Sequence, residues 1–319
     1  MFYITIYALA PIFVIMFLGF WAGKAGMVDN NNVSLLNIFV MDFALPAALF
    51  SATVHTPWQG IVAQWPLIIV ITGAMWITYA VIYFLSIKVF NKSPQDSAVL
   101  TLTVALPNYA ALGLPILGSV LGENPATSLS VAVSIAAGSV LLTPFCLLVL
   151  EREKVREKGE NNGSTFTLLP VLMWRSVKKP IVLGPLIGVM LSAMGIKMPD
   201  LVFAAIKPLG LAATAAALFL TGIILSARKL KFNAVVGIGT IAKLLIQPII
   251  AWGIVLALGL NGPVAVTAIL MISLSAGFFG VVFGNRFGVQ SPDAEAVLLL
   301  SSVLCIISLP LFITLTAGI

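Results

Sequence analysis

The chain has 319 residues, of which 60% are hydrophobic and 9% are charged, and its mean hydropathy is +1.12. A soluble protein of this length cannot bury so much apolar surface, so the composition excludes a soluble globular fold and predicts a polytopic membrane protein. The net charge is +6, with the basic residues clustered between apolar segments, which indicates cytoplasmic loops and not nucleic-acid binding. One histidine and two cysteines in apolar segments do not supply the usual zinc or haem ligands, so no metal site or cofactor is expected.

Apolar runs separated by turn residues predict ten membrane-spanning helices, and thus an all-α polytopic membrane protein. In chain order these spans cover residues 4–22, 34–53, 63–88, 97–121, 127–150, 180–196, 202–226, 233–259, 264–285 and 292–317. The spans at 97–121 and 264–285 are the least uniform of the ten.

The basic residues fall in alternate loops between these spans. Positively charged loops stay in the cytoplasm, so the bias places the odd-numbered loops there. We therefore expect both termini to lie on the opposite, outer side of the membrane. The opposite loops contain only Lys197, with Lys207 near the start of a span. The predicted cytoplasmic loops contain Lys24, Lys88, Lys92, Arg152, Lys154, Arg156, Lys158, Arg175, Lys178, Lys179, Arg228, Lys229, Lys231 and Arg286.

A hydrophilic linker at 151–179 separates five predicted spans in residues 1–150 from five in residues 180–319. An odd number of spans in each half gives the second half the opposite polarity, so any repeat must be inverted. Each half contains a Gly-containing interrupted span, a short polar loop, and then a span with a proline, Pro144 or Pro310. This pattern predicts an inverted five-plus-five repeat.

The fourth span is interrupted at its centre by the stretch Leu106-Pro107-Asn108-Tyr109-Ala110-Ala111-Leu112-Gly113-Leu114-Pro115. Proline removes a backbone N–H and frees polar groups, which hydrocarbon tolerates only where protein or a water-filled cavity satisfies them. A broken helix at mid-depth therefore points to a transport site. Asn108 adds a side-chain amide that can donate to an anion or accept from a hydroxyl.

The ninth span contains two serines and several glycines between Ser273 and Arg286, which allow unwinding or close helix crossing. If the two interrupted spans cross, four half-helix ends meet near the membrane centre. Half-helix N-termini carry partial positive charge and free N–H donors, which suit a carboxylate. Tight helix packing without a ligand is the alternative explanation for the glycines.

Two ionisable residues, Asp42 and Lys243, lie within predicted spans, near the membrane centre. Placing such a group there costs on the order of 2.5–3.5 kcal/mol, so it normally faces a partner or a cavity. Three interpretations remain open. In the first, the two residues pair across a moving interface and gate it. In the second, Lys243 neutralises an anionic substrate while Asp42 carries a proton. In the third, each is structural, with Asp42 protonated or hydrogen-bonded and Lys243 bound to a backbone carbonyl.

These residues together resemble the auxin efflux carrier family, which includes plant PIN-FORMED carriers and bacterial malonate or malate permeases. The resemblance covers nearly the whole chain and rests on four motifs. They are Phe39 to Phe50, Pro107-Asn108, Lys243 with Pro248, and the stretch from Val282 to Asp293. Two positions depart from the family pattern: Ser275 stands where the plant carriers have a proline, and Asp42 is not a general feature.

The resemblance implies that broken spans 4 and 9 cross within an inverted repeat. It also implies that a core domain of spans 3–5 and 8–10 moves against a scaffold of spans 1, 2, 6 and 7, transporting organic anions by an elevator-like motion. We expect a secondary transporter, not an enzyme, and a dicarboxylate such as malonate or malate as substrate. The resemblance to the bacterial permeases also implies a multi-pass protein of a bacterial inner membrane, with both termini in the periplasm. The expected substrate contacts are Pro107, Asn108, Tyr109, Gly113, Ser273, Ser275, Gly277 and Lys243, with Asp42 in proton coupling or gating.

Alternatives to this interpretation are a potential-driven uniporter, an exporter of a monocarboxylate, a channel and a membrane sensor without transport. The expected partners are a small organic anion and the lipid bilayer, with protons and a homodimer left open. No nucleic-acid partner is expected. The short linker at 151–179 argues against a sensor, which would need a partner-docking domain.

Overall fold

The structure is a computed structural model that describes residues 2–30, 32–54, 57–122, 125–157, 178, 180–196, 198–227 and 232–317. Over these residues the chain is helical, without a β-strand. Five helical stretches are long and apolar enough to cross a membrane, which makes this a multi-pass membrane protein. They are Trp65–Lys88, Leu129–Arg156, Asp200–Ser226, Ala234–Ala257 and Pro292–Thr316.

Every predicted span coincides with one helix or with a series of helices. The first half contains α1 (Phe2–Lys24), α2 (Ser34–Ile38), η1 (Phe39–Ala44), α3 (Leu45–Val54), α4 (Trp58–Ala63), α5 (Trp65–Lys88), α6 (Pro94–Ala105), η2 (Tyr109–Gly113), α7 (Leu114–Leu121), α8 (Pro125–Ala137), η3 (Gly138–Leu142) and α9 (Thr143–Glu157). The second half contains α11 (Pro180–Ala193), α12 (Asp200–Ser226), α13 (Ala234–Ile241), η4 (Ala242–Ile246), α14 (Gln247–Ala257), α15 (Pro263–Ile272), α16 (Phe279–Phe287) and α17 (Pro292–Thr316). The short helix α4 lies largely outside the predicted spans.

The starts of two helices are fixed by local capping. The Ser93 hydroxyl accepts a hydrogen bond from the Asp96 N–H, and Pro94 occupies the first turn, so α6 starts at 94 rather than at the predicted 97. The Asn233 side chain likewise accepts from the Val236 N–H at the start of α13. Each cap satisfies an N–H that has no partner within the helix.

The η1, η2, η3 and η4 segments are wide π-helical turns, and each ends two residues before a proline. Because proline has no N–H and clashes with the carbonyl four residues earlier, one extra residue in the preceding turn relieves the conflict. Asp42 and Lys243 both lie in such turns, in η1 and η4. The four prolines are Pro46, Pro115, Pro144 and Pro248.

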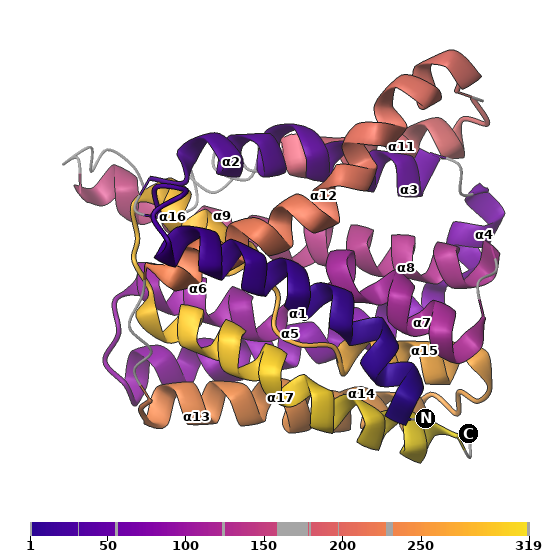
Figure 1. The fold of residues 1–319 in the computed structure, drawn as a ribbon. Coiled ribbons are helices and arrows are strands. Elements are labelled where there is room, and N and C mark those ends of the chain that lie inside the picture. The colour runs from indigo at the N-terminus through magenta and orange to yellow at the C-terminus, as the bar shows by residue number, and fades with distance from the viewer. Residues whose placement is uncertain are drawn as a thin grey trace.

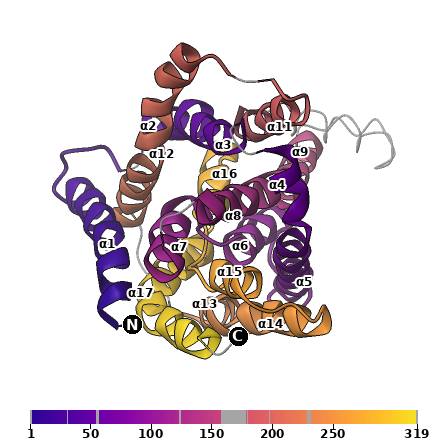
Figure 2. The same cartoon turned by 90° about the vertical axis from the view of Figure 1, so that its right-hand side faces the viewer.

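The helices form two groups that Figures 1 and 2 show side by side. The first helix group consists of α1, α2, η1, α3, α11 and α12. Its helices approach closely at glycines: a Cβ at Gly222 would lie 2.0 Å from the Met16 carbonyl oxygen, and one at Gly184 would lie 2.6 Å from that of Pro46. Small residues of this kind let helix backbones touch in a membrane.

The second helix group consists of α5 to α9 and α13 to α17 with the π-turns between them. Two short helices, α6 and α15, lie at its centre, where α6 is buried from Ser97 to Ala105 and α15 from Thr267 to Ile272. Both chain ends lie at one end of the helices in Figure 1, and the starts of α2 and α6 lie at the other.

An ionic network ties three helix starts of the second group together. Lys92 contacts Asp96 at 2.7 Å and Asp293 at 2.5 Å, so it joins the starts of α6 and α17. The Asn233 amide donates to Asp293 at 2.8 Å, and the Ser291 hydroxyl donates to Asp96. Burial lowers the pKa of Lys92, but the hydrogen bonds to Asp293 and Asp96 outweigh this effect and raise the net pKa above its ordinary value.

Candidate functional site

The two interrupted spans cross, and their backbones bond to each other directly. The Asn108 N–H donates to the Ser275 carbonyl at 3.0 Å, and the Gly277 N–H donates to the Leu106 carbonyl at 2.7 Å. Between these two bonds, Pro107 and Ala276 pair as a short antiparallel bridge. Each break thus satisfies the polar groups that the other leaves open, which explains how both persist in an apolar environment.

Four helix ends meet at this crossing. Helices α6 and α15 end there, and α16 begins there, as does the η2 turn that leads into α7. Helix α16 has no side-chain cap at its start, whereas α7 continues directly from η2, where the Asn108 and Tyr109 N–H groups bond to the Ser275 and Pro107 carbonyls. The crossing therefore presents the N–H groups at the start of α16, and these form a partially positive environment for a carboxylate.

Asn108 is the polar side chain at the centre of this arrangement. It is 4% exposed, and its Oδ1 has no hydrogen-bond partner among the residues that the structure describes. A buried amide left unpaired costs about 1–3 kcal/mol, so its persistence indicates that a ligand or water completes it. An amide can rotate about its χ2 axis, so it can present either its acceptor or its donors to that ligand.

The second break forms without the proline that the plant carriers have at the position of Ser275. Its shape is held from outside, because the Ser301 hydroxyl on α17 accepts from the Ala276 N–H at 3.1 Å. Only glycine fits at position 277, since a Cβ there would lie 2.5 Å from the Leu106 carbonyl oxygen. Tertiary hydrogen bonds and close approach replace proline as the cause of the interruption.

Lys243 lies directly at the ends of the two buried helices. Its ammonium donates to the Ile272 carbonyl at 3.0 Å and to Gln247 Oε1 at 2.5 Å. The Gln247 amide in turn donates to the Ala105 carbonyl at 2.6 Å. The pair therefore caps the C-terminal ends of both α6 and α15, where the helix dipoles are negative. Both side chains are 0% exposed.

Asp42 pairs with a residue that the sequence interpretation did not consider. Its carboxylate accepts from Arg286 Nη1 at 2.8 Å, which joins η1 of the first helix group to the end of α16 in the second. The interpretation in which Asp42 pairs with Lys243 is therefore wrong for this structure. No local pattern connects Asp42 and Arg286, which are 244 positions apart.

The remaining predicted contacts divide between the crossing and the surrounding packing. Pro107, Asn108, Ser275 and Gly277 come together at the crossing. The Tyr109 hydroxyl points to the Met75 sulfur at 3.7 Å, and Ser273 donates to the Ile269 carbonyl of its own helix. A Cβ at Gly113 would lie 2.9 Å from a methyl of Val131.

Sequence reasoning missed three residues that the structure places in or beside the site: Gln247, Ser301 and Arg286. Of these, only Gln247 had a local signal, because it follows Lys243 by four positions and therefore lies on the same helix face. Ser301 and Arg286 act through contacts with distant elements.

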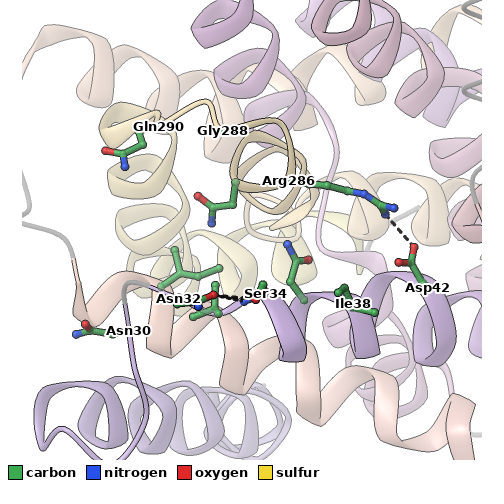
Figure 3. Close-up of a pocket in the computed structure, with 12 residues that line it drawn as sticks. Asn30, Asn32, Ser34, Ile38, Asp42, Arg286, Gly288 and Gln290 are labelled. Carbon is green, nitrogen blue, oxygen red and sulfur yellow. Dashed lines mark hydrogen bonds and ion pairs between the residues drawn. The ribbon is translucent and has the colours of Figure 1, made fainter. Parts of the chain in front are cut away.

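A polar cavity of about 530 Å³ opens beside the Asp42–Arg286 pair, between the two helix groups (Figure 3). Both side chains of the pair point toward each other at one side of it. The cavity is lined by Asn30, Asn32, Val33, Ser34, Asn37, Ile38, Asp42, Ile224, Asn285, Arg286, Gly288 and Gln290.

Two broken helices that cross inside a multi-pass helical protein are the architecture of a membrane transporter. Residues 4–313 match the model of the membrane transport protein family. The chain belongs to this family, the auxin efflux carrier family that its motifs resemble.

Two relatives align over almost the whole chain. One is "Uncharacterized transporter YfdV" of Escherichia coli (strain K12), which is 26% identical over 309 residues and covers 96% of this chain and 95% of its own. The other is "Putative malonate transporter" of Rhizobium meliloti (strain 1021), which is 25% identical over 321 residues and covers 93% of this chain and 91% of its own. Like them, this chain is a membrane transporter.

Proposed function

We propose that the protein is a secondary active transporter of a small organic anion, with a dicarboxylate such as malonate or malate as substrate. The observation that carries this proposal is the buried Asn108 amide, whose oxygen has no partner among the described residues, at a crossing where two helices begin. A carboxylate at this place would accept from Asn108 and from the backbone N–H groups at the start of α16.

Two observations favour a dicarboxylate over a monocarboxylate. In this proposal Lys243 is protonated and places a positive charge near the crossing, although its hydrogen bonds go to Gln247 and to the Ile272 carbonyl and not into an open space. Its contribution is therefore the field of a buried charge and not a direct contact. The relative from Rhizobium meliloti carries the name "Putative malonate transporter".

The arrangement of the helices supports an elevator-like motion of the second helix group against the first. The first group is locked by backbone contacts at glycines such as Gly222, whereas the crossing lies entirely within the second group. In this proposal the ten helical spans form an inverted five-plus-five repeat. The basic loops lie in the cytoplasm of a bacterium and both termini in the periplasm.

Uptake of radiolabelled malonate into proteoliposomes tests the substrate and the site together. A hydrogen bond to a charged group is worth about 1.5–3 kcal/mol, so Asn108→Ala should reduce uptake by roughly tenfold or more. Asn108→Asp should reduce it further, because a second negative charge repels the anion. The matched control is Asn261→Ala, since Asn261 is exposed and, within the described part of the chain, its side chain bonds only to the nearby Gly259 carbonyl. Wild-type liposomes without saturable uptake, or full uptake by Asn108→Ala, would refute the proposal.

The driving force is either a proton gradient or the membrane potential. Proton symport in this proposal uses Asp42, the carboxylate that joins the two helix groups. An imposed pH gradient should then accelerate uptake by the wild type but not by Asp42→Asn. Uptake that follows the potential and ignores the pH gradient would assign a uniport mechanism instead.

A further inference from the structure

The polar cavity beside Asp42 and Arg286 lies apart from the crossing. Its walls come from the segment before α2, from α2, η1 and α12 in the first helix group, and from the end of α16 and the residues that follow it in the second. Helix α16 has nine residues and so spans about 13 Å, with the crossing at its start and Arg286 in its last turn. The cavity and the crossing therefore lie at opposite ends of one short helix.

The cavity contains groups that are suited to a polar ligand. Asn37 is 9% exposed, and its Oδ1 finds no hydrogen-bond partner within the described part of the chain. Among the described residues, the Arg286 guanidinium bonds only to Asp42, and it does so through Nη1. Its other N–H donors take no part in that bond. A cavity of about 530 Å³ falls within the range of ~300–1,000 Å³ that is typical of small-molecule sites.

The ion pair at the edge of the cavity can be exchanged. The side chains of Arg286 and Asp42 are 35% and 20% exposed, so water screens the pair and a second carboxylate can compete for the guanidinium. A guanidinium binds a free carboxylate through two parallel hydrogen bonds, whereas here it makes one bond to Asp42.

We propose that this cavity is a second substrate site, in which a small carboxylate with a hydroxyl or a protonated second acid group displaces Asp42 from Arg286. The carboxylate binds Arg286, and the hydroxyl or acid proton donates to Asn37. Loss of the Asp42–Arg286 pair releases α16 from η1, so occupancy of the cavity frees the second helix group to move. This inference rests on the proposed function, because it takes the same substrate class.

Thiol labelling measures occupancy of the cavity without relying on transport. Ser34 lines the cavity and is exposed, and its hydroxyl bonds to Asn32 and not to Arg286 or Asn37. The neighbouring Leu35 is 82% exposed and does not line the cavity, so it provides the matched control. Both native cysteines, Cys146 and Cys305, are buried and will not compete for a maleimide.

Malonate and malate are each added to purified full-length Ser34→Cys, and the rate of maleimide labelling is followed. We expect at least threefold protection at position 34 and none in Leu35→Cys. Arg286→Gln should remove the protection. Arg286→Lys keeps the charge but cannot make two parallel hydrogen bonds to a carboxylate, so it should retain part of the protection. Asn108→Ala should keep the protection, because that substitution affects only the crossing. Asp42→Asn should lower the ligand concentration that gives half-maximal protection several-fold, because no carboxylate of the protein then competes for Arg286.

The opposite effects of Asp42→Asn and Arg286→Gln distinguish a ligand site from a structural ion pair, whose two partners would act in the same direction. The inference would be overturned if Asp42→Asn and Arg286→Gln changed the protection in the same direction. It would also be overturned if protection survived in Arg286→Gln or disappeared in Asn108→Ala. Malonate uptake by the wild type without protection at position 34 would overturn this inference alone. Protection without uptake would support the cavity site and overturn the proposed transport of malonate.

Discussion

The two buried partners that cap the helix ends, Lys243 and Gln247, lead to a prediction in which one substitution rescues another. Gln247→Met leaves the Ala105 carbonyl without its donor and removes one of the two acceptors of the Lys243 ammonium. An unsatisfied buried group costs about 1–3 kcal/mol, and more when it is charged, so we expect a loss of about 3–5 kcal/mol.

Lys243→Met has a smaller effect because two terms oppose each other. It leaves the Ile272 carbonyl and Gln247 Oε1 unpaired, but it also removes a buried ammonium. An ammonium at membrane depth costs roughly 2.5–3.5 kcal/mol on insertion scales, which offsets most of the loss. The double variant Lys243→Met with Gln247→Met should therefore be more stable than Gln247→Met alone.

Thermal unfolding in detergent, followed by fluorescence-detected size-exclusion chromatography, measures the stability of the wild type, the two single variants and the double variant. At about 2 °C per kcal/mol, Gln247→Met should lower the apparent Tm by roughly 6–10 °C. Leu245→Met is the matched control, since Leu245 lies in the same turn and is 40% exposed. Additive losses in the double variant, or a Gln247→Met protein that melts like the wild type, would refute the capping argument. A Lys243→Met protein of normal stability that no longer binds malonate would instead place the ammonium in the substrate site.

Two further predictions concern the packing of the second helix group. Gly280→Ala should destabilise the protein by about 1–3 kcal/mol or more, because its Cβ would lie 2.4 Å from the Val99 carbonyl oxygen. The control is Gly253→Ala, whose Cβ would have no atom within 4 Å, so it should leave the Tm unchanged or raise it. Lys92 has a raised pKa, so its stabilisation is present below about pH 10.4 and is lost as the pH rises through the folded-state value. The Tm of the wild type should therefore fall more steeply above pH 10 than that of Lys92→Met, and parallel curves would contradict the role of the network.

The sequence determined the features that depend on neighbouring residues. Composition placed the chain in a membrane, and apolar runs located the helices, because burial of apolar side chains in lipid needs no distant partner. Proline chemistry located the break at Pro107-Asn108, since a missing N–H disturbs the helix wherever it lies. The motifs around these positions were sufficient to indicate the family to which the chain belongs.

Only the tertiary structure decided which polar groups meet. It paired Asp42 with Arg286 and turned Lys243 and Gln247 toward the ends of α15 and α6. It also held the second break open through Ser301 and Gly277 without a proline. Each of these contacts joins residues that are far apart in the chain. A charge or an amide in an apolar span must find a partner, but its own sequence neighbourhood does not specify which one, because helix packing brings the partners together.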